Sequence, residues 1–350
     1  MDDSNLTPRQ LAILNSLGVV PKIREDIVKA IGAVYPVSKA TLMRDLEVLI
    51  KLGFALTQGK GKATVYISKI NKLNMPIDLE EYFRDSSKIR KTCPKPFNLE
   101  VFDHLDDIFT NLEIEDLKQQ NIFLSSKRKT LDPSIFKKEI ERFTVEFAWK
   151  SSKIEGNTYS LLETEVLIKQ MKEAFGRTTH ETLMILNHKK AIDYILEKPD
   201  TFKIISVEKI ISLHRILTKD LEIASGIRNT PVAITGTDFI PLDKRADIKR
   251  ALERLVILIN DTSFPLAKAL LSLVLISYIQ PFVDGNKRTS RTISNAILIA
   301  NDFYPLSYRN LDEVEYLKTI LLFYETNNLY HLKRIIINQF KFVLENFFQG

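Results

Sequence analysis

Apolar residues recur at helical spacing over most of the 350-residue chain. Near the N-terminus, four leucines between Ser38 and Gly53 recur at spacings of four, three and three, so they share one helix face. Ser38 is a preferred helix cap and Gly53 a preferred helix end. Short β-branched runs then replace the helical pattern. The elements expected in this part of the chain are helices at 8–17, 24–31 and 39–52 and strands at 54–57 and 64–67.

Three helices followed by a hairpin with a basic, glycine-containing tip resemble a winged helix-turn-helix domain, here residues 1–70. In that family the third helix enters the major groove of DNA, and the hairpin tip touches backbone phosphates. Asp45 and Glu47 reduce the positive charge of the third helix, and winged helices also dock proteins. Both DNA contact and a structural or protein-binding role therefore stay open. The residues that would contact DNA are Lys39, Thr41, Arg44, Lys60 and Lys62.

Beyond residue 70 the pattern is helical with few breaks, which predicts a mainly α fold. Residues 71–145 are expected to form a helical connecting region. The one strand signal lies between Pro231 and Pro241, where β-branched residues flank Gly236 and predict a β-hairpin. Helical runs are expected at 132–154, 161–175, 181–196, 206–217, 248–259 and 266–279.

Composition and charge add only broad limits. Apolar residues make up 45% of the chain and charged residues 27%, as in ordinary globular proteins. The net charge of +6 allows an acidic partner, such as nucleic acid or nucleotide phosphates, although it can equally serve solubility. The single cysteine, Cys93, cannot close an internal disulfide and fits a reducing compartment. With no signal-peptide core or membrane-length apolar stretch, we expect a cytoplasmic protein without a membrane segment.

The residues with the clearest chemistry lie in the segment 279–291, between two expected helices. Pro281 ends the first helix, and Gly285 permits a tight turn. The second helix is expected to begin near Asn286, so that its free N–H groups face the loop. Such a helix start binds anions.

Three charged side chains of this segment add to the anion site. Arg288 and Arg291 share one helix face and can address the same anion. Asp284 is a carboxylate suited to Mg²⁺ held jointly with phosphate oxygens. Each residue alone also has an ordinary explanation, because aspartates often cap helices and arginines often face water. Their combination in one loop indicates a phosphate site.

The segment from Gln280 to Arg291, QPFVDGNKRTSR, resembles the Fic motif HxFx(D/E)GN(G/K)RxxR. Ser151 to Asn157 is similar to the inhibitory motif (S/T)xxxE(G/N) of that family, and residues 226–239 are similar to its flap. On these residues the last two thirds of the chain is identified as a member of the Fic (Fido) superfamily. The positions that match the Fic motif in register are Phe282, Asp284, Gly285, Asn286, Arg288 and Arg291.

The resemblance implies an all-helical Fic core over residues 146–350, with a β-hairpin flap at about 230–241. It also implies an inhibitory helix at about 146–158 and the motif loop at 279–291. Fic proteins typically transfer AMP from ATP to a hydroxyl of a target protein. ATP and Mg²⁺ are therefore the implied cofactors, and a target protein would dock on the flap by strand addition. Many relatives form dimers, so a homodimer is allowed by analogy.

The same resemblance implies roles for individual residues. Asp284 would hold Mg²⁺, while Arg288 and Arg291 would contact the β- and γ-phosphates. The backbone of Gly285, Asn286 and Lys287 would form an anion hole. Glu155 would pair with Arg291 and keep the γ-phosphate from seating, and Ser151 would help to fix the helix that carries Glu155. Tyr316 would be either a wall against adenine or part of the core.

Two positions depart from the commonest motif. Gln280 stands where the family has the histidine that removes the proton of the target hydroxyl, and an amide cannot take up a proton near neutral pH. Lys287 stands where glycine is commonest, and Doc members, which transfer the γ-phosphoryl group, also carry lysine there. None of the five histidines lies in the loop, and we expect those at 188 and 214 to be structural. The histidines are His104, His180, His188, His214 and His331.

Three functions fit these residues. The first is a protein AMP-transferase of impaired or conditional activity, held off by Glu155, since an inhibitory residue is useful only where there is activity to inhibit. The second is a catalytically inactive, nucleotide-sensing DNA-binding regulator, which Gln280 and the basic wing favour. The third is Doc-like phosphoryl transfer, which Lys287 favours.

Overall fold

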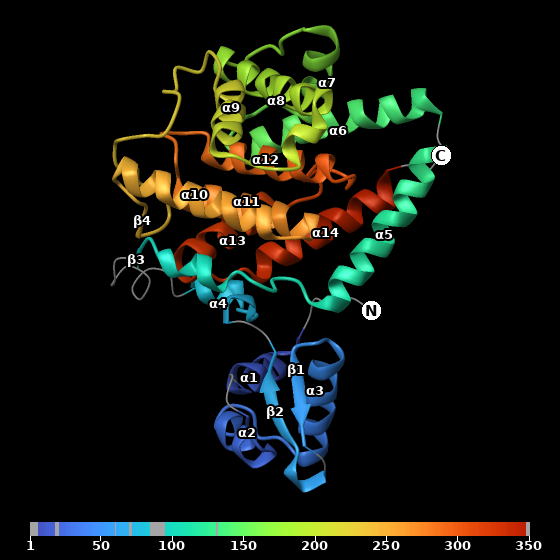
Figure 1. The fold of residues 1–350 in the computed structure, drawn as a ribbon, viewed down its shortest axis with the longest axis vertical. Helices are drawn as coiled ribbons and strands as arrows, with labels where there is room; N and C mark the ends of the chain where they lie inside the picture. The colour runs from blue at the N-terminus through green and yellow to red at the C-terminus, as the bar shows by residue number, and fades with distance from the viewer. Residues whose placement is uncertain are drawn as a thin grey trace.

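The computed structural model describes residues 6–17, 21–59, 61–69, 72–84, 95–130 and 132–347, and it is mainly helical (Figure 1). The expected fold class, mainly α, is confirmed. Lys60 and Cys93 lie outside the described residues, and the side chain of Lys62 is not described either.

The first helices and strands form a small N-terminal lobe, drawn in blue at the bottom of Figure 1. Their bounds agree with the expected ones to within one or two residues, and β1 and β2 pair antiparallel. Ser38 caps α3, as expected, by accepting a hydrogen bond from the N–H of Thr41 at 3.2 Å. The elements are α1 (Pro8–Leu17), α2 (Arg24–Ile31), α3 (Lys39–Lys51), β1 (Ala55–Gln58) and β2 (Val65–Ser68).

The remaining elements form a larger helical lobe. They are α4 (Leu79–Arg84), β3 (Lys95–Pro96), α5 (Asn111–Thr130), α6 (Pro133–Lys153), α7 (Leu161–Gln170), α8 (Thr179–Glu197), α9 (Val207–Leu217), β4 (Phe239–Ile240), α10 (Arg245–Asp261), α11 (Pro265–Ile279), α12 (Asn286–Ala300), α13 (Glu313–Thr326) and α14 (Tyr330–Asn346). Short 3₁₀ turns lie at Gly61–Ala63, Lys72–Asn74, Leu99–His104 and Pro199–Phe202.

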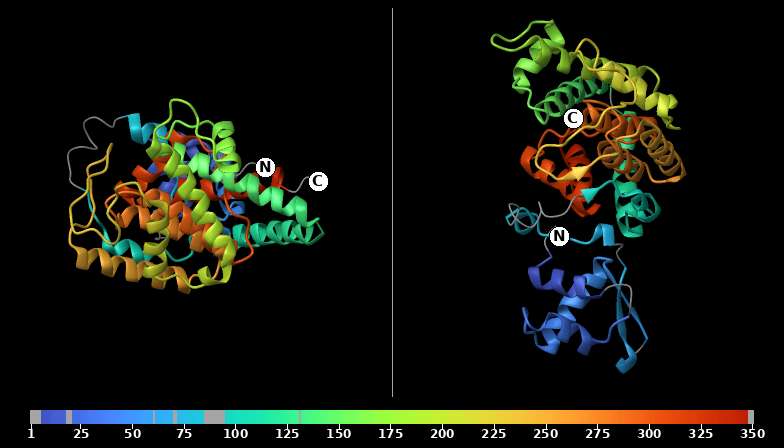
Figure 2. Two further views of the ribbon diagram at one scale, coloured as in Figure 1. Left: turned by 90° about the horizontal axis from the view of Figure 1, so that it is seen from above. Right: turned by 90° about the vertical axis from the view of Figure 1, so that its left-hand side faces the viewer.

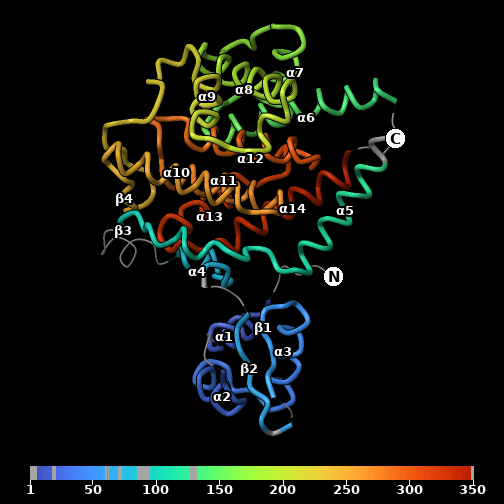
Figure 3. The backbone as a smooth tube through the Cα atoms, viewed as in Figure 1, coloured from blue at the N-terminus to red at the C-terminus, as the bar shows by residue number. Residues whose placement is uncertain are grey.

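Helix α11 is the centre of this lobe. Every residue from Leu266 to Ile279 is buried, and α10, α12, α13 and α14 pack around the helix (Figure 1). Helices α6, α8 and α9 contact α12 and cover it on its other side (Figure 3). The loop between α11 and α12 is therefore anchored at both ends by buried helices. Within the described residues, no helix combines the length and apolarity that crossing a membrane requires.

Helix α7 is shorter than the expected run of 161–175. It ends at Gln170, because Met171 adopts a left-handed conformation with φ of 54°. Met171 and Phe175 are both exposed. The predicted helix was too long because these two apolar residues continue the helical pattern in the sequence, although they face solvent.

The prediction of a β-hairpin at 231–241 was wrong. Residues 231–238 form no strand, and β4 pairs instead in parallel with β3, in a segment expected to be helical. The N–H of Phe97 donates to the carbonyl of Ile240 at 3.0 Å. The rings of Phe97 and Phe239 both stack on Tyr278, at 4.4 and 4.7 Å between centroids. This aromatic stack on α11 gives β4 a partner that is distant in sequence.

The expected inhibitory helix at 146–158 is the end of a longer helix. Ser151 lies in the last turn of α6, and Glu155 lies in the turn after the C-cap residue Ile154. The chain turns away at Gly156, whose φ is 92°. Glu155 is therefore held by a helix end rather than by a helix of its own.

The two lobes, which lie one above the other in the right-hand view of Figure 2, meet at the start of α14. Tyr330 is 6% exposed and belongs to the apolar core of the N-terminal lobe. The amide of Asn328 donates to the carbonyl of Met75 at 2.7 Å, and the N–H of Leu329 donates to the carbonyl of Leu73 at 2.5 Å. The chain between the lobes is thus bonded to the larger lobe.

Candidate functional site

The loop between α11 and α12 is shaped by the side chain of Asn286. Its Oδ1 accepts from the N–H of Phe282, and its Nδ2 donates to the carbonyl of Phe282, both at 2.9 Å. Nδ2 also donates to Oε1 of Gln280 at 2.9 Å. The side chain of Asn286 therefore holds the two ends of the loop together by hydrogen bonds, a role that its position at a helix start did not reveal.

The start of α12 is open to an anion. Gly285 precedes the helix with φ of 80°, and it has no side chain that could cap the first N–H groups. A Cβ at this position would lie 3.2 Å from Cγ2 of Thr218 and 3.4 Å from Nη2 of Arg288. Both the backbone conformation and the close packing thus require glycine. The free N–H groups and the helix dipole favour a bound anion.

Arg288 is buried against this helix start. Its Nη2 pairs with Oδ2 of Asp284 at 3.0 Å, whereas its Nε and Nη1 have no hydrogen-bond partner among the described residues. Burial lowers the pKa of Arg288, which the charge of Asp284 opposes. Buried N–H groups without partners are costly, so an anion that accepts from them would stabilise the site.

Arg291 is fully buried and is engaged by the end of α6. Its Nη2 pairs with Oε1 of Glu155 at 2.8 Å, and its Nε donates to Oγ of Ser151 at 2.9 Å. Burial acts to raise the pKa of Glu155, but the charges of Arg291 and Lys287 hold it below its usual value. Glu155 is therefore ionised near neutral pH and pairs with one of the arginines that were predicted to bind an anion.

His188 holds Ser151 from the other side, a contact that sequence analysis missed. Its Nε2 lies 2.9 Å from Oγ of Ser151, and its Nδ1 lies 2.8 Å from the carbonyl of Met184. Burial lowers the pKa of His188 to about 3, so the ring is neutral. Since a carbonyl only accepts, Nδ1 carries the proton and Nε2 accepts from Ser151.

Gln280 ends α11 in a left-handed conformation, and both its amide nitrogen and its amide oxygen are hydrogen-bonded. Nε2 donates to the carbonyl of Ser277 at 2.6 Å and lies 3.3 Å from the hydroxyl of Tyr324. Its Oε1 accepts from Asn286 at 2.9 Å. The carbonyl of Ser277 accepts only, which fixes the orientation of the amide. No group at this position can take a proton.

His214 is distant from the loop in sequence but contacts it. Its ring stacks on Phe282 with 3.7 Å between centroids, and its Nε2 lies 3.0 Å from the carbonyl of Asp284. Burial lowers the pKa of His214 to about 4, so the neutral ring donates to this carbonyl. The position of the histidine on the buried face of α9 is the only sequence signal for this contact.

A cavity of about 470 Å³ lies in front of the loop. It is lined by Glu155, Gln280, Asp284 and Lys287, by residues 232–235 of the flap, and by Leu317, Leu321 and Tyr324 of α13, among others. Tyr316 does not line it. That ring is fully buried, 6.0 Å from the guanidinium of Arg291, so its position favours core packing over a wall for adenine.

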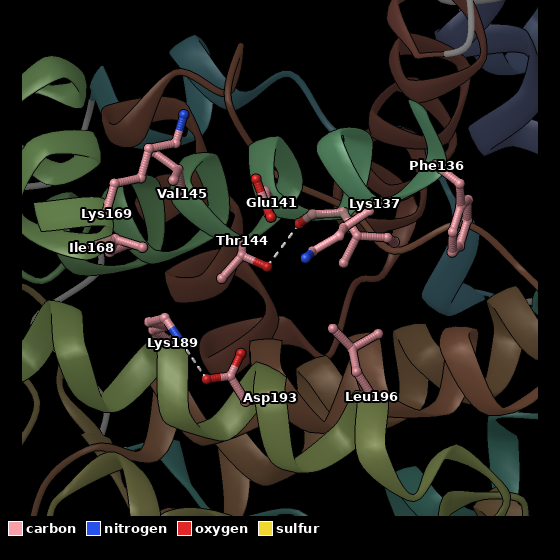
Figure 4. A pocket seen from close by; sticks show the side chains of 11 residues that line it. Phe136, Lys137, Glu141, Thr144, Val145, Ile168, Lys169, Lys189, Asp193 and Leu196 are labelled. Atoms are coloured by element: carbon pink, nitrogen blue, oxygen red, sulfur yellow. Dashed lines mark hydrogen bonds and ion pairs between the residues drawn. The ribbon is translucent and has the colours of Figure 1, made fainter. Parts of the chain in front are cut away.

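A larger cavity of about 670 Å³ lies between α6, α7 and α8 (Figure 4). Apolar side chains, including Phe136, Ile140 and Ile168, line much of it, and Lys189 and Asp193 pair at 2.5 Å on α8. None of the predicted site residues lines this cavity.

The predicted DNA-contact residues on α3 lie largely at the surface. Lys39 and Arg44 are exposed, whereas Thr41 is half-buried. Asp45 was expected to reduce the charge of this surface, but it is buried and pairs with Nε of Arg9 at 2.6 Å. The exposed face of α3 is therefore more basic than the sequence indicated.

The sequence model of the Fic/DOC family matches residues 204–298, which contain α9, the flap, the loop and most of α12. The chain contains a Fic/DOC domain. Among curated proteins, the protein adenylyltransferase Fic of Nematostella vectensis is 28% identical over 190 residues, 51% of this chain and 43% of that protein. The protein of the same name from Drosophila melanogaster is 29% identical over 163 residues, 44% and 32% of the two chains. This chain thus spans less than half the length of these relatives.

Solved structures share the fold of this chain. A Fic-1 fragment from C. elegans superimposes with a TM-score of 0.56 at 18% identity, covering 66% of this chain and 69% of that one. A Fic domain containing signaling protein from Bacteroides thetaiotaomicron VPI-5482 gives 0.55 at 20% identity, covering 66% and 95%. At these identities the likeness concerns the fold alone.

Proposed function

We propose that this chain binds ATP at the start of α12 and is a protein AMP-transferase of impaired or conditional activity. The observation that carries the proposal is the ion pair between Glu155 and Arg291 at 2.8 Å, in which a carboxylate of the chain itself occupies an anion site. The named activity of the curated relatives, protein adenylyltransferase, supports the choice of ATP and of AMP transfer.

The phosphates of ATP would replace the carboxylates that now pair with the arginines. Arg288 has two buried N–H groups without partners in the described part of the chain, and the N–H groups of Asn286 and Lys287 lie at the free helix start. These donors are fixed before ATP arrives, so they could stabilise the charge that develops on the phosphates. Arg291 would become available only after Glu155 moves away.

Asp284 is the residue that fits Mg²⁺. Its side chain is 61% exposed at the mouth of the anion site. Within the described residues there is no cluster of three or more His, Cys, Asp or Glu that could hold a metal alone. Mg²⁺ is usually held by one or two carboxylates together with phosphates and water, so one carboxylate suffices when ATP supplies the rest. Bound there, Mg²⁺ would neutralise charge on the phosphates.

Gln280 accounts for the impaired activity. A general base typically contributes about 10²–10⁴-fold in rate, and this position offers none. The amide oxygen accepts one hydrogen bond from Asn286 and has a second lone pair, so it could orient a target hydroxyl but could not remove its proton.

The flap would receive the target protein. Residues 232–235 line the cavity beside Gln280 and have no strand partner within the ranges that the structure describes, whereas β4 is paired with β3. An extended peptide of the target would add to the unpaired residues.

Incubation of the wild type and of Glu155→Gly with Mg²⁺ and α-phosphate-labelled ATP tests the proposal. We expect labelled protein with Glu155→Gly and little with the wild type. Label from γ-labelled ATP alone would indicate Doc-like phosphoryl transfer instead. No label in either protein, with ATP binding retained, would exclude the transferase.

A nucleotide-sensing DNA-binding regulator is the second candidate, and the exposed Lys39 and Arg44 on α3 favour it. DNA affinity that falls with salt and changes on addition of ATP would support this function. DNA affinity that ignores ATP would exclude nucleotide sensing. The homodimer allowed by analogy stays a prediction, which light scattering would test.

A further inference from the structure

Both oxygens of the Glu155 carboxylate are held, each by a different cation of α12. Oε1 pairs with Nη2 of Arg291 at 2.8 Å, and Oε2 lies 3.4 Å from Nζ of Lys287. Lys287 and Arg291 are four residues apart and so project from the same side of the helix. Glu155 fits between them from the end of α6.

The environment strengthens both contacts. The side chains of Glu155 and Lys287 are 16% and 29% exposed, so water screens the pair less than it would screen a surface pair. The other acidic group of the loop, Asp284, pairs with Arg288. The nearby lysines Lys150 and Lys153 both pair with Glu313. Within the described residues, Lys287 has no ion pair other than the one with Glu155.

We propose that Lys287 is a positioning residue for the inhibitory carboxylate, and that it exchanges Glu155 for a phosphate when ATP binds. The inference rests on the proposed function, because it requires ATP and Glu155 to compete for the cations of α12. In the resting protein Lys287 opposes ATP binding by holding Glu155 in place. Once Glu155 is neutral or displaced, the same ammonium group favours ATP.

This exchange makes the effect of removing Lys287 depend on residue 155. In a Glu155→Gln background the carboxylate charge is absent, so Lys287→Ala removes only a phosphate contact. We expect it to weaken ATP binding about tenfold there, as for a lost charge-assisted contact. With Glu155 present, Lys287→Ala also loosens the inhibitory carboxylate. ATP affinity should then fall by less than about twofold, or rise.

Titration calorimetry with MgATP on the two single variants, the double variant and the wild type measures the four dissociation constants. Lys287→Arg, which keeps the charge, should bind MgATP like its own parent, the wild type in one background and Glu155→Gln in the other. Lys153→Ala removes a neighbouring lysine that pairs with Glu313, and its effect should be the same in both backgrounds. Thermal melting of each variant verifies that the protein is folded.

The two failures are distinguishable. If Lys287→Ala weakens ATP binding equally in both backgrounds, Lys287 is a phosphate ligand only; the inference is overturned and the proposed ATP site stands. If folded Glu155→Gln protein binds no ATP, the proposed function and the inference are overturned together. A background-dependent effect of Lys287→Ala supports the inference.

Discussion

At the residue scale, Gln280 and His188 show how the same helical scaffold can hold two polar side chains for different purposes. Gln280 is bonded to Ser277 and Asn286, which fixes its amide but gives it no group that can take up a proton. His188 holds Ser151, which in turn holds Arg291. In the proposed function, Gln280 would limit the rate of transfer, and His188 would help to fix the side chains that inhibit it.

Gln280→His should restore a general base in the Glu155→Gly background. We expect AMP transfer to rise by about 10²–10⁴-fold, the usual contribution of such a group. The initial rate of labelling with α-phosphate-labelled ATP measures the change. Gln280→Ala serves as the control, and its initial rate of labelling should not exceed that of the Glu155→Gly parent. An unchanged rate with histidine would show that a missing base is not what limits the reaction.

His188 should make stability depend on pH. Burial lowers the pKa of His188 to about 3, so between this value and about 6.5 the unfolded chain binds the additional proton. Stability is full above about pH 6.5 and falls as pH decreases. Urea unfolding should show that the free energy of unfolding is lower at pH 5.5 than at pH 7, and His188 should account for about 1 kcal/mol of this decrease.

His188→Gln removes this titration and provides the control. His214, with its pKa lowered by burial to about 4, should still contribute a similar loss. The variant should therefore lose about 1 kcal/mol less than the wild type over the same pH interval. Equal losses in both proteins would contradict the assignment of a neutral, buried His188.

At the scale of elements, the short strand β4 fixes one end of the flap. Phe239 is 3% exposed and stacks on Tyr278, whereas its neighbour Ile240 is 53% exposed. The buried and exposed sides of this two-residue strand therefore differ sharply. The flap is anchored by this aromatic stack and by the pairing of β4 with β3, rather than by a hairpin partner.

Phe239→Ala should destabilise the protein by about 3 kcal/mol, as for other buried phenylalanines. Ile240→Ala, on the same strand, should change the free energy of unfolding by no more than about 0.5 kcal/mol. Denaturant unfolding measures both changes. Similar losses for the two variants would mean that β4 is anchored by its backbone pairing and not by the aromatic stack.

At the scale of the whole molecule, the contact at Tyr330 joins two lobes with separate cores. This residue begins α14 of the larger lobe, yet its ring belongs to the core of the N-terminal lobe. The regulator hypothesis requires that ATP binding influence the N-terminal lobe. The contact at Tyr330 and the chain beside it are the route that we expect for this influence.

Tyr330→Ala should uncouple the lobes, because it removes an aromatic side chain from the N-terminal core. We expect the N-terminal lobe to melt several degrees earlier than in the wild type, with the larger lobe little changed. Scanning calorimetry would show the separation. Val314→Ala, at a position that is 63% exposed, is the control. A variant that melts like the wild type would show that the contact at Tyr330 contributes little.

Local sequence signals determined much of this protein. Helix caps such as Ser38, breakers such as Pro281 and the continuous apolar run of α11 act within a few residues, so the sequence alone predicted most helices. The motif loop was identified in the same way, because Asp284, Gly285 and Asn286 are adjacent in the chain. The exposed Met171 and Phe175 show where the same kind of signal misled.

Tertiary structure alone decided which distant residues meet. The pairing of β3 with β4, the contact of His188 with Ser151 and the contact of Lys287 with Glu155 each join separate elements. Such contacts arise because α6, α8 and α12 pack together around a shared core, and no short stretch of sequence encodes that packing. The sequence placed Lys287 and Arg291 on one helix face. The packing of α6 against α12 decided that Glu155 pairs with both of them.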